Sequence, residues 1–221
     1  MRSTCWVGDP MLWLKLFHAL CWVYWLGADA GTFYAARFIA DPQLTPAARA
    51  TAAKIMLGID LAPRVCMPLT LASGLHLAAA SGFVALSGGA IAAVWVVGLA
   101  WMGVAVWLHH AAPGARKERV ARADFIWRGV LVAALVASAA FIAPWLALKV
   151  LCFAATVVCG MAIRVHLKPF GPAFGTLMSR GASADVDAAI ARSIARCVPY
   201  VIVIWVLLLV SAAAGLHALV I

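Results

Sequence analysis

Residues 90–111 read AIAAVWVVGLAWMGVAVWLHHA, a stretch that contains no Asp, Glu, Lys or Arg. A helix needs about 20 mostly apolar residues to cross the hydrocarbon core of a bilayer, which is about 30 Å thick. The stretch therefore predicts a membrane-spanning helix. Five other stretches meet the same criterion, which gives six predicted spans: 11–39, 63–83, 90–111, 125–143, 144–166 and 197–219.

The composition of the whole chain agrees with this prediction. Of its 221 residues, 66% are hydrophobic and 11% are charged, and the mean hydropathy is +1.02. A soluble domain cannot cover so much apolar sequence with so little polar surface, and disordered chains and disulfide-stapled secreted scaffolds do not carry it. We therefore expect an all-α, polytopic bundle of six transmembrane helices, residues 1–221 forming a single domain in a lipid bilayer.

The basic residues predict how the chain crosses the membrane. The formal net charge is +9, and Lys and Arg gather in alternate connections, which indicates the cytoplasmic side. Both termini should then lie outside, in the periplasm, and the protein should reside in a bacterial inner membrane. Because these cations separate apolar runs, nucleic acid is not an expected partner. The cationic connections contain Arg49, Lys54 and Arg64, then Arg116, Lys117, Arg119 and Arg122, then Lys168, Arg180, Arg192 and Arg196.

Capping residues predict two further helices in the cytoplasmic connections. Thr45 followed by Pro46 is typical of a helix start, so residues 46–61 should be helical up to Pro63. Ser183 can cap a helix over 184–196, with acidic residues in its first turn. Both helices should lie at the membrane surface. Residues 87–89 should form a short external turn, and Pro144 should begin the fifth span after a tight turn.

Histidines are the first candidates for chemistry, because ionisable groups within spans are costly and usually face the bundle interior. At 1.5 Å per residue, His18 and His76 both lie roughly 10 to 12 Å inside the outer ends of their spans, so they share a level. The remaining histidines fall near span ends, where an interfacial role is the simpler interpretation: His109, His110, His166 and His217.

One face of the first span is polar and aromatic. His18, Trp22, Trp25 and Asp29 are spaced by four, three and four residues, so they share a helix face. One interpretation is packing surface, with His18 hydrogen-bonded to a neighbouring helix. The other is that His18 is an axial ligand of a haem packed against Trp22 or Trp25. His76 would then be the candidate opposite ligand.

Two charged positions have more than one interpretation. Lys149, in the outer half of the fifth span, can pair with a haem propionate or extend to the interface. Asp29 can serve a proton relay or pair with Arg37 or Arg64, and pairing is the cheaper explanation because a lone intramembrane charge is unfavourable.

Six cysteines form no C-x-x-C pair and no zinc spacing, so most are interpreted as packing residues. Cys66 and Met67 are soft ligands that copper(I) accepts. Several helices would have to come together to complete such a site.

Several of these residues resemble the CopD/HemJ group of membrane proteins, which comprises the copper-resistance D family and the HemJ-type protoporphyrinogen oxidases. Spans three and four, 90–143, have no counterpart in the compact HemJ-type proteins. The resemblance implies haem b held by His18, and an oxidoreductase role in porphyrin oxidation or electron transfer. It also carries over Arg37 and Lys149 as functional residues. The matching residues are Leu14-Lys15-Leu16-Phe17-His18, Trp25, Tyr34 and Arg37, then Lys54-Ile55-Met56, Pro68 and Gly74-Leu75, then Trp145 to Lys149, and Arg196 with Pro199.

The expected function is therefore a haem b-binding membrane oxidoreductase or electron-transfer protein, with quinone or a porphyrin-like hydrophobic molecule as partner. Two alternatives stay open. The first is copper transport or homeostasis of the CopD type. The second is a structural subunit of a homo-oligomer or larger membrane complex, with Trp95, Trp101 and Trp107 either in the contact or facing lipid.

Overall fold

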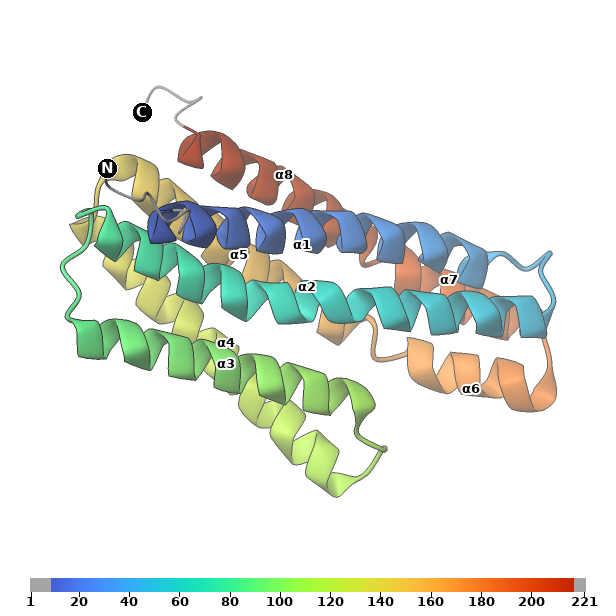
Figure 1. Ribbon diagram of the computed structural model, residues 1–221. Coiled ribbons are helices and arrows are strands. Elements are labelled where there is room, and N and C mark those ends of the chain that lie inside the picture. Colours follow the sequence, from blue (N-terminus) through green and yellow to red (C-terminus); the bar gives the residue numbers. More distant parts are fainter. Residues whose placement is uncertain (1–8, 217–221) are drawn as a thin grey trace, which may run out of the picture. The chain divides into compact units, whose positions relative to one another are not determined.

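The computed structural model describes residues 9–216, and all of its regular elements are helical (Figure 1). It confirms the predicted all-α class. The elements in chain order are α1 (Pro10–Ala40), α2 (Pro46–Ala80), α3 (Gly88–His110), α4 (Ala115–Ser138), the 3-10 turn η1 (Ala139–Phe141), α5 (Pro144–His166), α6 (Phe170–Arg180), α7 (Ala184–Ala195) and α8 (Val198–Gly215).

Six segments of the described chain are long and apolar enough to cross a membrane. They are α1, α2, α3, the stretch Ala115–Phe141, α5, and the stretch Ala184–Gly215, which joins α7 and α8. The backbone polar groups of such segments are satisfied within each helix, as a bilayer requires. The chain is a multi-pass membrane protein.

The described residues divide into two compact units, and α1 and α2 each contribute to both. The first unit comprises residues 9–27 and 61–111, and the second comprises 28–60 and 112–216. Each unit is described by itself. The first contains one half of α1, one half of α2 and all of α3, and the second contains the other halves with α4 to α8.

Within the first unit, α2 and α3 approach closely at Gly98. A Cβ atom built on Gly98 would lie 3.0 Å from Cβ of Ala72 and 3.4 Å from the carbonyl oxygen of Pro68. Small residues allow backbones to approach in this way where helices pack in membranes. Gly98 therefore sets the spacing between α2 and α3.

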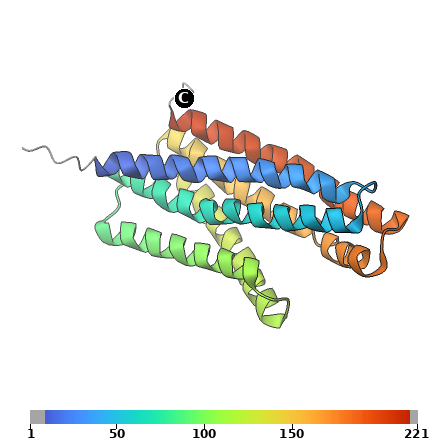
Figure 2. The same ribbon diagram turned by 45° about the vertical axis from the view of Figure 1, so that its right-hand side comes forward.

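Within the second unit, α5 packs along α8 and also along α4, while α6 and α7 form a helical hairpin (Figure 2). The hairpin shares an apolar core with the end of α1 and the start of α2. The buried residues of this core are Ile39, Ala53, Leu177 and Ile190. This core buries residues of the two helices that were predicted from their caps, Ala53 in 46–61 and Ile190 in 184–196.

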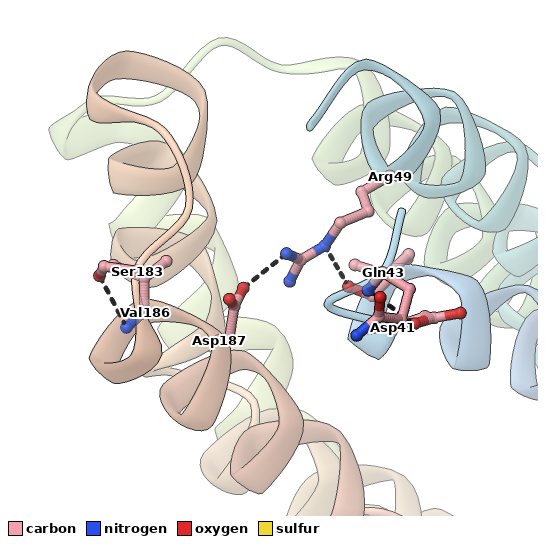
Figure 3. Close-up of polar contacts among 7 residues, drawn as sticks. Asp41, Gln43, Arg49, Ser183, Val186 and Asp187 are labelled. Carbon is pink, nitrogen blue, oxygen red and sulfur yellow. Dashed lines mark hydrogen bonds and ion pairs between the residues drawn. The ribbon is translucent and has the colours of Figure 1, made fainter. Parts of the chain in front are cut away.

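A buried arginine joins three of these helices (Figure 3). Arg49 of α2 is fully buried. Its Nε donates to the carbonyl oxygen of Ile39 at 2.8 Å, and its Nη1 donates to Asp187 of α7 at 2.6 Å. The interaction fixes the end of α1 and the start of α7 to α2.

The predicted caps are present. The backbone N–H of Ala48 donates to Thr45 Oγ1 at 3.3 Å, and that of Val186 donates to Ser183 Oγ at 3.4 Å. Pro144 occupies the first turn of α5. These side chains satisfy backbone donors that a helix start leaves unpaired.

The predicted helix end before Pro63 is wrong. α2 continues through both Pro63 and Pro68 to Ala80, so the helix predicted over 46–61 and the second span are one element. Proline removes a helix hydrogen bond, but neighbouring helices and local adjustments make it tolerable in membrane helices.

Three other boundaries also differ from the prediction. Ser87 accepts a hydrogen bond from the N–H of Ala90 and caps α3, so 87–89 is a helix start rather than only a turn. α4 begins at Ala115, ten residues before the predicted start at Phe125, because its first turns are charged but helical. α6 was not predicted. The predicted end of the last span, beyond residue 216, lies outside the described residues.

Candidate functional site

His18 of α1 is held by Ser73 of α2, within the first unit. His18 Nδ1 lies 2.8 Å from Ser73 Oγ, and the Ser73 hydroxyl donates to the carbonyl oxygen of Leu69 at 2.7 Å. Which of the two atoms donates depends on the tautomer of the imidazole, because the Ser73 hydroxyl can donate its one proton to either Leu69 O or His18 Nδ1. Ser73 is buried, so this orientation of the imidazole is defined by the protein interior.

The Ser73 contact is compatible with the tautomer in which a histidine binds a metal ion. With the proton on Nδ1, Nε2 carries the lone pair through which a neutral imidazole binds a metal ion. Metal-ligating histidines commonly donate the other ring N–H to a protein acceptor, which fixes the ring orientation. Ser73 Oγ could serve as that acceptor for His18.

A glycine makes room for the His18 ring against α2. A Cβ atom on Gly74 would lie 3.1 Å from His18 Cε1 and 3.7 Å from Nδ1. A side chain at this position would press on the imidazole. Gly74 and Ser73 together therefore form a seat for His18 on α2.

His76 lies one helical turn beyond Ser73 and contacts α3. The indole Nε1–H of Trp95 donates to His76 Nδ1 at 3.2 Å, and the two rings meet edge-to-face with centroids 6.3 Å apart. Trp95 also contacts Phe17 of α1, with centroids 5.9 Å apart. One cluster thus joins the three helices of the first unit.

The contact with Trp95 defines the tautomer of a neutral His76. An indole N–H can only donate, so Nδ1 of His76 is an acceptor, and the proton of the neutral ring lies on Nε2. Ligation through His76 Nε2 would move that proton to Nδ1, facing the Trp95 donor. His76 as opposite ligand stays a prediction, and it requires the hydrogen bond to Trp95 to be given up.

The tryptophan side chains of the first unit differ in how deeply they are buried. Trp25 is buried and Trp22 is half-buried on α1. On α3, Trp101 is buried and Trp95 is half-buried in the contacts given above. The Trp101 side chain therefore does not face lipid, and for the half-buried Trp95 and Trp107 both alternatives stay open.

The structure also brings together two cysteines that the sequence analysis interpreted separately. Cys21 on α1 and Cys66 on α2 lie close enough to interact with each other. Both are buried and neither is in a disulfide. No short motif connects residues that are so far apart in sequence, so no spacing rule identifies this pair.

In the second unit, Lys149 of α5 lies at the end of α8. Its Nζ is 2.6 Å from the position that a Cβ on Gly215 would occupy. The C-terminal end of a helix carries partial negative charge and favours a cation. This contact gives Lys149 a structural partner, and pairing with a haem propionate stays a prediction.

The other predicted polar positions of α1 lie elsewhere in the second unit. Asp29 accepts a hydrogen bond from Trp205 Nε1 at 3.0 Å, and Phe33 contacts the same indole. Arg37 is exposed. The hydrogen-bond partner of Asp29 in this unit is thus Trp205 of α8 rather than Arg37. A functional role for Arg37 stays a prediction.

The sequence analysis did not predict an ion-pair network that joins α4 and α5 in the structure. The Asp124 side chain has 0% exposure, and it accepts hydrogen bonds from Arg128 Nε at 2.9 Å and Arg164 Nη1 at 2.6 Å. The i, i+4 spacing of Asp124 and Arg128 is a signal that could have identified part of it. Arg164 comes from another helix.

The remaining histidines divide between the two units. His109 and His110 contact each other at the end of α3. His166 of α5 stacks on Tyr200 of α8, and its Nε2 lies 3.1 Å from the Tyr200 hydroxyl. His217 and Cys5 lie outside the described residues.

His18 stays a candidate axial ligand of a haem. The described residues contain no cluster of three or more His, Cys, Asp or Glu side chains that could hold a metal ion. A haem needs only one or two axial ligands because the porphyrin supplies the rest. Ser73 is the residue that would orient His18 as such a ligand.

Comparisons with protein-family models, with curated protein sequences and with solved structures found no match to the chain.

Proposed function

We propose that the protein is a haem b-binding membrane oxidoreductase or electron-transfer protein, with His18 as the axial ligand. The observation that supports the proposal is the contact between His18 Nδ1 and Ser73 Oγ, which is also what helix packing alone would give and which, with the ring proton on Nδ1, would direct the Nε2 lone pair to the iron. A solvent-facing histidine needs no such buried partner. Bound haem b supplies a one-electron couple within the membrane.

The other candidate residues have distinct proposed roles. Ser73 orients the His18 ring, and Gly74 leaves room for it. Trp25 supplies buried apolar surface beside the site. Arg37 and Lys149 are proposed to act electrostatically on propionates, protons or substrate, as the family resemblance implies.

The number of histidine ligands on the haem iron decides between oxidoreductase chemistry and electron transfer. A single histidine ligand leaves an iron position for substrate chemistry, whereas two histidines favour electron transfer. The His76 tautomer selected by Trp95 favours the single-ligand form. A quinone or a porphyrin-like molecule is the proposed hydrophobic partner, and a bacterial inner membrane with both termini outside is the proposed location.

The function is tested by reduction with a quinol. Purified protein in detergent is mixed anaerobically with reduced tetramethylbenzoquinone, and the visible spectrum is followed. We expect the reduced haem bands to grow in. A protein that carries haem but is reduced only by dithionite would contradict the quinone link, and a protein without haem bands would contradict the proposal itself.

Replacing Ser73 with Ala tests the support of the ligand. We expect haem to be retained about 10- to 100-fold less tightly, because loss of a partner that orients a metal ligand has this effect. Transfer of haem to apomyoglobin measures the change. Ser138→Ala, in the second unit, is the control, and equal transfer rates for the two variants would show that Ser73 does not support the ligand.

The proposed orientation has its own test. A single cysteine placed at Lys117, in a variant without native cysteines, should react with a membrane-impermeant maleimide only after the membrane is opened. This result follows from the cationic connection around Lys117 being cytoplasmic. Labelling in intact cells would reverse the orientation.

A further inference from the structure

Exposed arginines follow one face of α4 into the part of this helix that can span a membrane. Arg116, Arg119 and Arg122, which we call the basic face of α4, are all exposed. Farther along the helix, Ile126 and Val130 are 61% and 58% exposed. At 3.6 residues per turn, these five positions fall within an arc of about 120°. One side of α4 is therefore basic over its first turns and apolar after them.

The opposite side of α4 is fixed within the second unit. Asp124 and Arg128 are buried there, and Asp124 accepts hydrogen bonds from Arg128 and from Arg164 of α5. Leu135 is buried on the same side, three turns along. These contacts fix the rotation of α4 about its own axis, so the basic face points away from α5.

The basic face and the apolar surface after it belong to one continuous helix. α4 runs from Ala115 to Ser138 without a break, so no loop separates the arginines from the apolar residues. Arg122 and Ile126 are one turn apart, which is about 6 Å of helix rise. A single phospholipid can cover this length, with its headgroup at the arginines and its acyl chains against the apolar residues.

The chemistry of the basic face selects a negatively charged headgroup. A guanidinium group binds a phosphate through two parallel hydrogen bonds. Residues 115–122 contain four basic side chains and one acidic side chain, Glu118, so the first turns of α4 attract anions. A soluble acidic partner would use the arginines but would have no use for exposed Ile126 and Val130. A lipid uses both parts of the surface.

We propose that the basic face of α4 binds the headgroup of an anionic phospholipid, whose acyl chains lie against Ile126 and Val130. The lipid comes from the leaflet that meets this end of α4. Basic side chains next to a membrane span are attracted to anionic lipids in this way. The site uses neither His18 nor Ser73, so it does not depend on the proposed haem.

The test measures lipid binding by the full-length protein in an uncharged maltoside detergent. The protein is titrated with dioleoyl phosphatidylglycerol, and the first bound lipid is followed by native mass spectrometry. We expect wild type to bind this lipid more tightly than dioleoyl phosphatidylcholine. One basic side chain strengthens the attraction about fivefold, so the triple variant Arg116→Gln, Arg119→Gln, Arg122→Gln should bind phosphatidylglycerol about 100-fold more weakly.

Two further triple variants serve as matched controls. Lys54→Gln, Lys168→Gln, Arg180→Gln removes the same charge from exposed positions outside α4, and it should bind phosphatidylglycerol as wild type does. Replacing the three arginines of the basic face with Lys keeps the charge and should retain most of the affinity. Circular dichroism of each variant shows that its helices are intact.

Three results would overturn the proposal. The first is equal affinity of wild type for phosphatidylglycerol and phosphatidylcholine. The second is equal affinity of the two Gln triple variants for phosphatidylglycerol. The third is displacement of the bound lipid by an equal concentration of inorganic phosphate, which would assign the arginines to a soluble phosphate compound instead.

Discussion

Changing Asp124 to Asn is expected to lower the free energy of unfolding by about 3–5 kcal/mol. The carboxylate is fully buried between α4 and α5 and balances two guanidinium groups. Arg128 is buried too, while the Arg164 side chain retains 30% exposure. Removing one partner of a buried ion pair leaves uncompensated charge, and breaking such pairs has costs of this size.

Equilibrium unfolding in mixed micelles, followed by circular dichroism, measures this change. Asp185→Asn is the control, because Asp185 is exposed in the first turn of α7 and should cost no more than about 1 kcal/mol. The double variant Asp124→Leu, Arg128→Leu should recover part of the loss, since apolar pairs can replace buried ion pairs. An Asp124→Asn protein as stable as wild type would show that the network does not stabilise the fold.

Changing His18 to Ala is expected to remove haem from the protein almost completely. His18 is the proposed axial ligand, and its Nδ1 contacts the hydroxyl of the buried residue Ser73. The measurement is haem per chain in detergent-purified protein. His18→Gly with added imidazole should recover haem binding, which separates loss of the ligand from loss of the fold.

His76 and His110 supply the controls for this prediction. His76→Ala should retain haem and shift its spectrum, because His76 contacts the cluster of Trp95 and Phe17. His110 is exposed at the end of α3, so His110→Ala should change neither haem content nor spectrum. Full haem content in His18→Ala would remove the main assignment.

Features that depend on neighbouring residues in the sequence were predicted well. Apolar runs of sufficient length identified the spans, and Thr45, Pro144 and Ser183 identified helix starts that the structure contains. Each depends on a local rule of helix hydrogen bonding or membrane thickness. The helix end predicted before Pro63 was wrong, because the rule that proline ends a helix is weaker inside a membrane bundle.

Features that depend on packing between helices were not predictable from spacing. The sequence placed His18 and His76 at one level but did not identify Ser73 or Trp95 as their partners. These partners come from different helices, and helical periodicity defines faces without defining which faces meet. The Cys21 and Cys66 pair and the contact between Asp124 and Arg164 were missed for the same reason.

The most direct test of the central claim is the haem content of wild-type protein, measured by the pyridine haemochrome assay on detergent-purified material from haem-replete cells. The account predicts about one haem b per chain, held by a single seat for an imidazole ligand. A colourless preparation that is folded and monodisperse, with no haemochrome bands, would contradict it.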